Sequence, residues 1–241
     1  MHILVIDGGH VEAEFRAKFG PAHEYTFLTT DYKKDWQPVK EAIAKATDTA
    51  DVAFCFSVSL DIINHYRVID TDVATFPIFV EVVKESLAES HWAAANGPPS
   101  GTFFGFCGLP TLINRSLLEV SLYHEADREK LAETCAALGT DYRVVADRVG
   151  LVTPRVICQV INEACFTVQE GTASMADVDL AMKLGTNYPR GPFAWANAIG
   201  VGRVYAVLEA LWQDTHDERY KICPLLKRQA LRGEPFDLLS S

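Results

Sequence analysis

Residues 171–195 read G-T-A-S-M-A-D-V-D-L-A-M-K-L-G-T-N-Y-P-R-G-P-F-A-W, and this stretch decides the fold. Ser174-Met175-Ala176-Asp177 has the form of a capping box with Asp in place of Glu, which predicts a helix from there to Leu184. A further helix is expected from Pro192 to Ala198. The stretch therefore predicts two helices joined by a short turn.

The chain around this stretch is predicted to be helical from about residue 148 to the C-terminus. Thr153-Pro154 predicts an N-cap followed by the first helical residue of a long helix that reaches about Glu170 and ends at Gly171. Further helices are expected at 192–198, 202–213 and 224–231. Because only helices are expected after Asp147, we place a domain boundary there, with domains at 1–147 and 148–241.

The first half alternates short apolar runs with helical stretches, which is typical of a βα-type sheet domain. Strands are expected at 2–6, 25–29, 51–57, 75–80, 102–107, 117–122 and 142–146. Helices are expected at 11–19, 37–46, 82–88 and 126–138, the last ended by Gly139.

Composition excludes several classes of protein. With 241 residues and 49% hydrophobic content, the chain can bury a substantial core. The net charge of −10 disfavours nucleic acid and anionic membrane surfaces as partners. No apolar run approaches the ~20 residues of a membrane span, and the N-terminus lacks a cationic signal region. We therefore expect a cytoplasmic location.

The six cysteines form no C-x-x-C pair, and no His stands at metal-ligand spacing, so neither a metal site nor a disulfide framework is expected. Cys135, Cys158 and Cys165 are expected to be buried and to act as small hydrophobic residues.

A family resemblance is carried by the same decisive stretch. Its matching residues are Asp177, Asp179, Ala181, Met182, Gly185, Tyr188, Pro189, Gly191 and Pro192. They fall where 3-hydroxyacyl-CoA dehydrogenases carry D-x-D-x-A-M-x-x-G-x-x-Y-P-x-G-P, and Asn162–Ala164 and Pro224–Leu226 extend the match. The resemblance implies an α/β Rossmann-like N-terminal domain and an all-α C-terminal dimerisation domain of the 6-phosphogluconate dehydrogenase C-terminal-like type. It also implies a homodimer formed through helices 154–170, 174–184 and 192–213.

The family binds NAD through G-x-G-x-x-G at the first strand-helix turn, where backbone N–H groups approach the pyrophosphate. Here the turn reads Asp7-Gly8-Gly9-His10-Val11-Glu12, so Gly9 alone keeps its place. Carboxylates at the other two positions would repel a pyrophosphate, although they would also favour the positive end of a helix. We therefore expect no bound cofactor, with NAD as the cofactor if the family activity is retained.

The family's catalytic histidine lies in G-x-H-F-F-N-P and works with a following glutamate. Placing Gly105-Phe106-Cys107 on that motif puts Cys107 at the histidine and Glu119 at the glutamate. A thiol accepts a proton only as thiolate, so Cys107 is interpreted as a packing residue or, alternatively, as a repurposed nucleophile. The family's substrate-binding Ser/Asn/Thr cluster is expected near 77–81, which reads P-I-F-V-E, and Pro154 replaces a substrate-contacting asparagine.

Other constellations carry less weight. The pairs His10 with Glu12 and His65 with Asp61 could be acid-base pairs but are common on protein surfaces. The tryptophans Trp92, Trp195 and Trp212 are expected to fill the core or the dimer contact.

Three functions remain open. The leading hypothesis is a degenerate family member, a pseudoenzyme that has lost NAD binding and hydride transfer but could still bind an acyl-CoA, another metabolite or a protein partner. The second is an active NAD(P)-dependent 3-hydroxyacyl-CoA oxidoreductase of fatty-acid metabolism. The third is a protein-interaction module that lends only its dimer face.

Overall fold

The computed structural model of the protein describes residues 1–30, 37–56, 76–93 and 101–238. The chain divides into two compact units. The sheet unit comprises Met1–Gly108 and Leu112–Leu151, and the helical unit comprises Leu109–Thr111 and Val152–Ser241. Leu109–Thr111 therefore belongs to the helical unit, although the chain on both sides of it belongs to the sheet unit.

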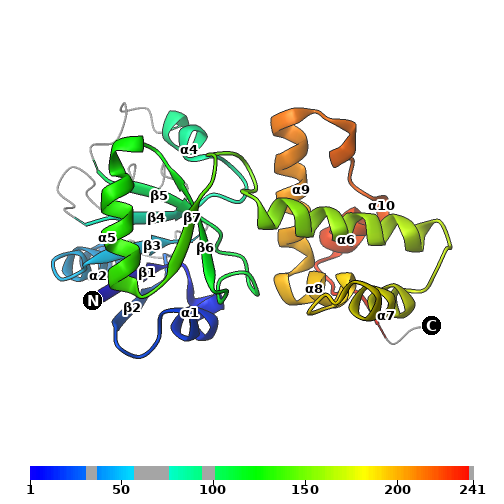
Figure 1. Cartoon of the computed structure of the whole chain (residues 1–241), viewed down its shortest axis with the longest axis horizontal. Coiled ribbons are helices and arrows are strands. Elements are labelled where there is room, and N and C mark those ends of the chain that lie inside the picture. Colours follow the sequence, from blue (N-terminus) through cyan, green and yellow to red (C-terminus); the bar gives the residue numbers. More distant parts are fainter. Residues whose placement is uncertain (31–36, 57–75, 94–100, 239–241) are drawn as a thin grey trace. The chain divides into compact units, whose positions relative to one another are not determined.

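The sheet unit contains seven strands in the order β2-β1-β3-β4-β5-β6-β7 (Figure 1). Neighbouring strands are parallel except for β5 and β6. All seven predicted strands are confirmed, two of them with the predicted bounds. The strands are β1 (His2–Ile6), β2 (Glu24–Leu28), β3 (Val52–Cys55), β4 (Ile78–Glu81), β5 (Phe103–Phe106), β6 (Leu117–Leu122) and β7 (Asp141–Val144).

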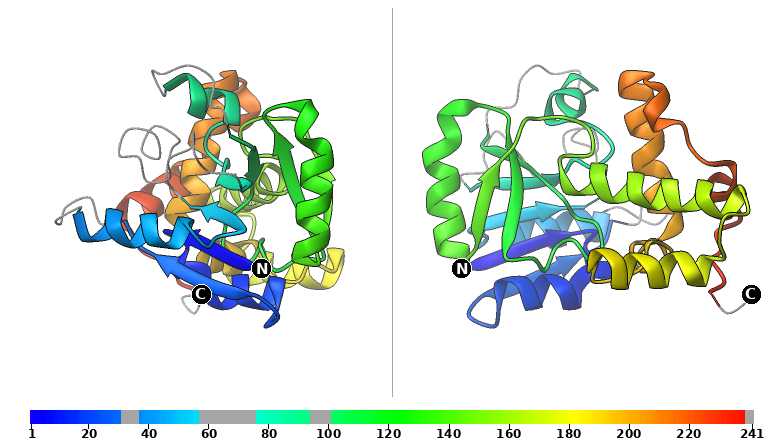
Figure 2. Two further views of the ribbon diagram at one scale, coloured as in Figure 1. Left: turned by 90° about the vertical axis from the view of Figure 1, so that its left-hand side faces the viewer. Right: turned by 45° about the vertical axis from the view of Figure 1, so that its right-hand side comes forward.

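Helices cover both faces of the sheet, as a largely parallel sheet requires. In the left view of Figure 2, the sheet lies between α5 (Arg128–Leu138) and α2 (Gln37–Thr47). Helix α1 (Glu12–Phe19), which follows a 3-10 turn at Gly9–Val11, shares a buried core with α5. That core is rich in aromatic rings, and the Phe54 and Phe79 rings stack with their centroids 4.6 Å apart. Gly139 ends α5 in the left-handed conformation, which confirms the predicted C-cap.

The helix predicted over 82–88 is wrong. Helix α4 (Leu87–Ala93) begins only at Leu87, after strand β4 has ended at Glu81. Ser86 and Glu89 form a capping box, in which Glu89 N–H donates to Ser86 Oγ at 3.1 Å and Ser86 N–H donates to a Glu89 carboxylate oxygen at 2.7 Å. The Asp147 carboxylate accepts further bonds from the N–H groups of Leu87 and Ala88, at 2.9 and 3.0 Å. These caps fix the helix start and hold Asp147 in the sheet unit.

The strand order reverses at β1, which is where open α/β sheets form a ligand-binding crevice. Strand β1 lies between β2 and β3, so the chain leaves β1 on one side and returns on the other. Loops diverge at such a reversal, and ligands of open α/β sheets bind beyond the carboxyl ends of the strands there. The dinucleotide-binding order 3-2-1-4-5-6 has a further strand outside the second, and no such strand lies among the elements that the structure describes.

The helical unit contains five α-helices among the described residues and confirms the predicted all-α half. Thr153 is not the N-cap predicted for it: α6 begins with Thr153 itself, and Val152 occupies the cap position without a side-chain hydrogen bond. Ser174 is the predicted cap of α7, because its Oγ accepts a bond from Asp177 N–H at 3.2 Å. The helices are α6 (Thr153–Gln169), α7 (Met175–Thr186), α8 (Pro192–Ile199), α9 (Val201–Thr215) and α10 (Pro224–Arg232).

One carboxylate joins α7 to α8 and explains much of the decisive sequence stretch. Asp179 accepts bonds from the N–H groups of Phe193 and Ala194, at 2.7 and 2.9 Å, and so caps α8. Gly191 permits this approach, because a Cβ there would lie 2.5 Å from the Asp179 Cα atom. Asp179 and Gly191 thus both take part in the contact between α7 and α8.

Two asparagine amides, one buried and one half-buried, hold the remaining segments of the helical unit. Asn162, on α6, donates to the Lys221 carbonyl and accepts from Cys223 N–H, both at 2.9 Å, which fixes the segment before α10. Asn197 makes the same paired contact with the backbone of Phe236. Within the described ranges, no helix combines the length and the apolar character that crossing a membrane would demand.

Candidate functional site

In the first strand-helix turn, the Asp7 side chain is held by hydrogen bonds within the protein. Asp7 has a φ of 58°, a left-handed conformation that favours glycine. Its carboxylate accepts hydrogen bonds from Thr30, from the backbone N–H at 2.7 Å and from the hydroxyl. Glu12, at the other altered position, pairs with Arg16 at 2.8 Å. The hydrogen-bond partners of the two carboxylates are thus Thr30 and Arg16, and not the N–H groups at the start of the helix.

The ring of Phe56 occupies the crevice itself. Phe56 follows β3, is fully buried, and packs edge-on against the Phe106 ring with centroids 5.2 Å apart. A Cβ on Gly8 would lie 2.8 Å from atoms of this ring, and a Cβ on Gly108 would lie 2.7 Å from it. The ring therefore sits between the backbone turns that follow β1 and β5. Only glycine leaves room for it at either turn.

These residues do not fit a dinucleotide in the position that doubly wound sheets use. There the pyrophosphate lies against the backbone of the glycine turn at the helix N-terminus. Here a phenyl ring packs on Gly8, and Asp7 places a carboxylate in the same turn. Gly9, the predicted remnant of the cofactor site, is exposed, and a Cβ on it would meet no described atom within 4 Å.

The two predicted catalytic positions lie near the same end of the β5-β6 pair. Strands β5 and β6 pair antiparallel, and their register ends with Phe106 opposite Val120. Cys107 directly follows Phe106 and Glu119 directly precedes Val120, so a register continued beyond the end of β5 would pair them. Cys107 is buried and Glu119 is half-buried beside Arg143, its partner in the β6-β7 register. A thiol and a carboxylate thus stand where the resemblance implies an imidazole and a carboxylate.

The sequence analysis did not single out Glu81, a further acidic residue at this edge of the sheet. Glu81 is the last residue of β4, and its Oε1 lies 2.7 Å from the position of a Cβ on Gly108. Its place at the carboxyl end of a parallel strand was the signal that could have found it. Among the residues that the structure describes, no group of three or more His, Cys, Asp or Glu side chains is arranged to hold a metal ion.

Residues 150–235 match the model of the family described as 3-hydroxyacyl-CoA dehydrogenase, C-terminal domain. This part of the helical unit is therefore similar to the C-terminal domain of the 3-hydroxyacyl-CoA dehydrogenase family. The match supports the resemblance and includes the segment in which Asp179 and Gly191 make their contact.

Relatives named as dehydrogenases of 3-hydroxyacyl-CoA compounds match part of the chain. The chain is 44% identical over 87 residues to the 3-hydroxyadipyl-CoA dehydrogenase of Escherichia coli, covering 36% of this chain and 18% of that protein. It is 33% identical over 144 residues to a probable 3-hydroxybutyryl-CoA dehydrogenase of Deinococcus radiodurans, covering 58% of this chain and 51% of that protein. The matched parts thus span from about a fifth to about half of these relatives' lengths.

Solved structures of the family share the fold over nearly the whole chain. The (S)-3-hydroxybutyryl-CoA dehydrogenase of Ralstonia eutropha aligns with a TM-score of 0.68 and 20% identity, covering 96% of this chain and 94% of that one. A 3-hydroxybutyryl-CoA dehydrogenase of Escherichia coli aligns with a TM-score of 0.71 and 15% identity, covering 100% of this chain and 60% of that one. The likeness confirms a Rossmann-like sheet region followed by a helical domain.

One of the two substrate positions that the family resemblance implies, the strand-to-helix turn, lies later in the chain than predicted. Residues 78–81 form strand β4, so the strand-to-helix turn spans 82–86 and not 77–81. A hydroxyl is present there, on Ser86, but it donates to the Glu89 carboxylate at 2.9 Å as part of the helix cap. Pro154 lies in the first turn of α6. Neither position offers a side-chain amide.

The histidine-acid pairs and the tryptophans that the sequence analysis considered make the following contacts. The His10 ring packs edge-on against Phe56 with centroids 5.8 Å apart, and Glu12 pairs with Arg16. His65, Asp61 and the side chain of Trp92 lie outside the described part. Trp195 donates its indole N–H to Thr111 Oγ at 2.8 Å, and Trp212 lies beside the His216 ring.

All six cysteines are free and buried, which confirms the prediction for Cys135, Cys158 and Cys165. Burial raises the pKa of Cys158 to about 12. Burial also raises the pKa of Cys135 to about 12, even though the nearby Lys18 ammonium acts in the opposite direction. The thiols of Cys135 and Cys158 are therefore neutral packing groups at physiological pH.

Proposed function

We propose that this chain is a member of the 3-hydroxyacyl-CoA dehydrogenase family that has lost NAD binding and hydride transfer and has kept the helical unit as a pairing domain. The carrying observation is the Phe56 ring, buried between the turns at Gly8 and Gly108 where a dinucleotide would need open backbone. Asp7, held by Thr30, adds a negative charge to the same turn.

The catalytic positions support the same proposal. An imidazole serves as a base near neutral pH because its pKa lies close to 7, whereas a thiol must first lose its own proton. Cys107 is buried and has no imidazole, so the position offers a packing side chain in place of the family's base.

Titration calorimetry of the purified protein with NAD, NADH and acetoacetyl-CoA tests the proposal. We expect no heat with NAD or NADH at millimolar concentration, and no NADH oxidation when acetoacetyl-CoA is present. Binding of the CoA ester alone would identify the protein as a ligand-binding relative without redox activity.

The alternative is an active NAD(P)-dependent oxidoreductase, which the names of the relatives favour. Saturable heat with NADH followed by turnover would establish that function and overturn our proposal. In that case Glu81 and Glu119, at the carboxyl edge of the sheet, would be the first acid-base groups to replace.

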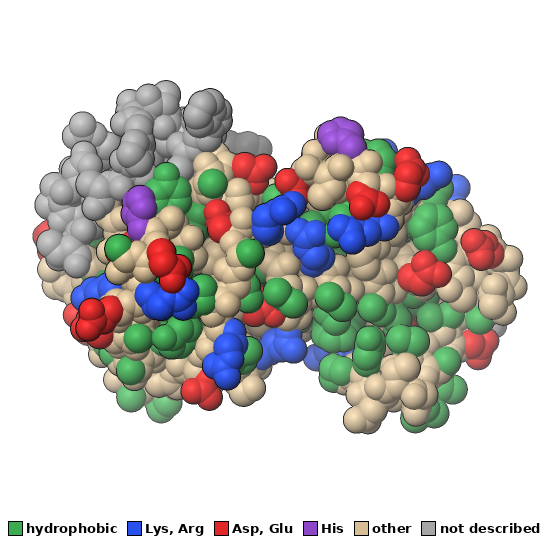
Figure 3. Space-filling model, turned by 45° about the horizontal axis from the view of Figure 1, so that its top comes forward, with side chains coloured by type: hydrophobic (Ala, Val, Ile, Leu, Met, Phe, Trp, Pro, Cys, Tyr) green, Lys and Arg blue, Asp and Glu red, His purple; other side chains and the backbone are tan. Residues whose placement is uncertain are grey.

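We further propose that the helical unit forms a homodimer through the face that carries α6 and α7. Large apolar side chains are exposed on this face: Val156 at 52%, Leu180 at 55% and Leu184 at 77%. A groove of about 480 Å³ runs between the two helices and is lined mostly by apolar groups, among them Val160, Ala181 and Met182. Hydrophobic side chains also gather on the helical unit in Figure 3. Exposed patches of this kind mark interaction surfaces.

Replacing Leu184 by glutamate should weaken the dimer by at least about tenfold, since it would place a charge in an apolar contact. Sedimentation velocity over a concentration series measures the change. Leu231→Glu is the matched control, because Leu231 is 70% exposed and lies on α10, outside α6 and α7. A wild-type protein that stays monomeric, or equal weakening by both variants, would contradict the proposed face.

A further inference from the structure

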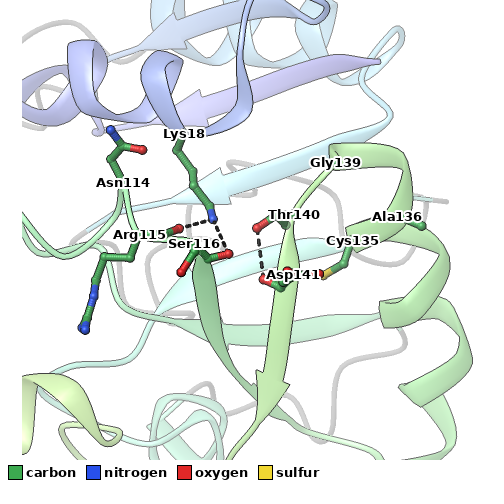
Figure 4. Close-up of a pocket in the computed structure, with 9 residues that line it drawn as sticks. All are labelled: Lys18, Asn114, Arg115, Ser116, Cys135, Ala136, Gly139, Thr140 and Asp141. Atoms are coloured by element: carbon green, nitrogen blue, oxygen red, sulfur yellow. Dashed lines mark hydrogen bonds between the residues drawn. The ribbon is translucent and has the colours of Figure 1, made fainter.

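A second hollow of the sheet unit lies apart from the crevice filled by Phe56. It has a volume of about 450 Å³ and opens between α1, the loop before β6 and the turn from α5 into β7 (Figure 4). Small-molecule sites commonly have volumes of about 300–1,000 Å³. Its polar lining comes from Lys18, Asn114, Ser116, Thr140 and Asp141.

Lys18 supplies the central cation of this hollow. Its side chain reaches from α1 toward the loop before β6, where the ammonium donates to the carbonyl oxygens of Arg115 and, at 3.4 Å, Ser116 (Figure 4). An ammonium has three N–H donors, so these two bonds leave one donor for a further acceptor. Among the described residues, no carboxylate oxygen lies within 4.0 Å of the Lys18 ammonium, the distance that defines an ion pair.

The effect of burial on the Lys18 ammonium is only partly offset by nearby negative charge. Loss of solvent lowers the pKa of Lys18, while the Asp141 carboxylate, beyond ion-pair distance, acts to raise it. Burying a cation costs free energy unless an anion or good acceptors compensate for lost water. An added anion next to Lys18 would therefore stabilise the charged form of the lysine.

Further donors surround the same point. In the described part of the chain, the side chains of Asn114 and Ser116 have no hydrogen-bond partner, and both line the hollow. The Arg115 guanidinium is at the rim and points away from Lys18 in Figure 4. The Glu14 carboxylate lies near the same loop, where it accepts hydrogen bonds from the N–H groups of Ile113 and Asn114. A cation with a remaining donor, next to side chains that can also donate, attracts small anions.

We propose that this hollow binds a small oxyanion, with Lys18 as the principal contact and Asn114 and Ser116 as further donors. Charge-assisted hydrogen bonds of this type are stronger than neutral ones. Asp141 lines the same hollow and repels a second negative charge. The site therefore favours a monocarboxylate over a phosphate dianion.

Backbone amide chemical shifts of the whole chain, titrated separately with acetate and with phosphate at constant ionic strength, test the assignment. We expect saturable shifts at 114–116 and 139–141, with tighter binding of acetate. Lys18→Met should weaken acetate binding by at least about tenfold, because it removes the charged donor. Lys130→Met is the matched control, since Lys130 lies on the exposed side of α5 and pairs with Glu133 at 3.7 Å.

A second variant tests the role of Asp141 in the opposite direction. Asp141→Asn removes the repelling charge, so it should tighten phosphate binding several-fold and reduce the preference for acetate. Absence of saturable shifts at these residues, or acetate binding unchanged by Lys18→Met, would overturn the site. Tighter binding of phosphate by the wild-type protein would overturn the preference for a monoanion. These outcomes are independent of whether the chain binds NAD.

Discussion

Replacing Phe56 by alanine is expected to lower the free energy of unfolding by about 3–5 kcal/mol, the range for large aromatic residues removed from a core. The ring is fully buried and makes edge-on contacts with Phe106 and Phe15, with centroids 5.2 and 6.0 Å apart. It also separates the turns at Gly8 and Gly108, so its loss leaves a cavity that two glycines cannot fill.

Urea unfolding followed by circular dichroism measures this loss. Phe27→Ala serves as the control, because Phe27 lies on the edge strand β2 and is only half-buried. A smaller loss is expected there, about 1–2 kcal/mol, in proportion to the apolar area that it buries. If Phe56→Ala costs no more than the control, the ring does not occupy the crevice as tightly as described, and the main support for the proposed loss of NAD binding is removed.

Replacing Gly191 by alanine is expected to cost about 2–4 kcal/mol, the sum of a steric clash and a weakened helix cap. The added Cβ would lie 2.2 Å from the Asp179 Cγ atom and 2.5 Å from its Cα atom. The backbone of α7 would have to retreat, which would lengthen the bonds from Asp179 to the N–H groups of Phe193 and Ala194.

The thermal unfolding midpoint of the helical unit provides the measurement. Gly185→Ala is a matched control in α7, because a Cβ at Gly185 meets no described atom within 4 Å. Alanine should be neutral or stabilising there by up to about 1 kcal/mol, since it favours a helix more than glycine does. Equal midpoints for the two variants would show that the α7-α8 contact does not require glycine.

Much of the helical half could be predicted from sequence because its signals are local. Ser174 caps a helix through a residue three positions later, and Gly139 ends one through its own backbone conformation. The failed helix at 82–88 shows the limit of such signals. Val82 and Val83 are buried β-branched residues that follow strand β4, and the helix start depends on Asp147, far along the chain.

The candidate site was predicted less completely, for the same reason. The sequence pattern revealed the altered turn at Asp7 and the positions Cys107 and Glu119, which adjoin the last pair of the β5-β6 register. It could not show that Asp7 bonds to Thr30, or that the Phe56 ring lies between Gly8 and Gly108. Both contacts join segments distant in sequence, and nothing in the local pattern of either segment encodes them.

The membership of Leu109–Thr111 in the helical unit bears on how this chain can be divided or recombined. Thr111 accepts the indole N–H of Trp195, so the residues after Leu151 do not carry the whole of their unit. A gene fragment that starts after Leu151 would leave that indole without its acceptor. Transplanting the helical half onto another sheet therefore requires grafting the short excursion between β5 and β6 along with it.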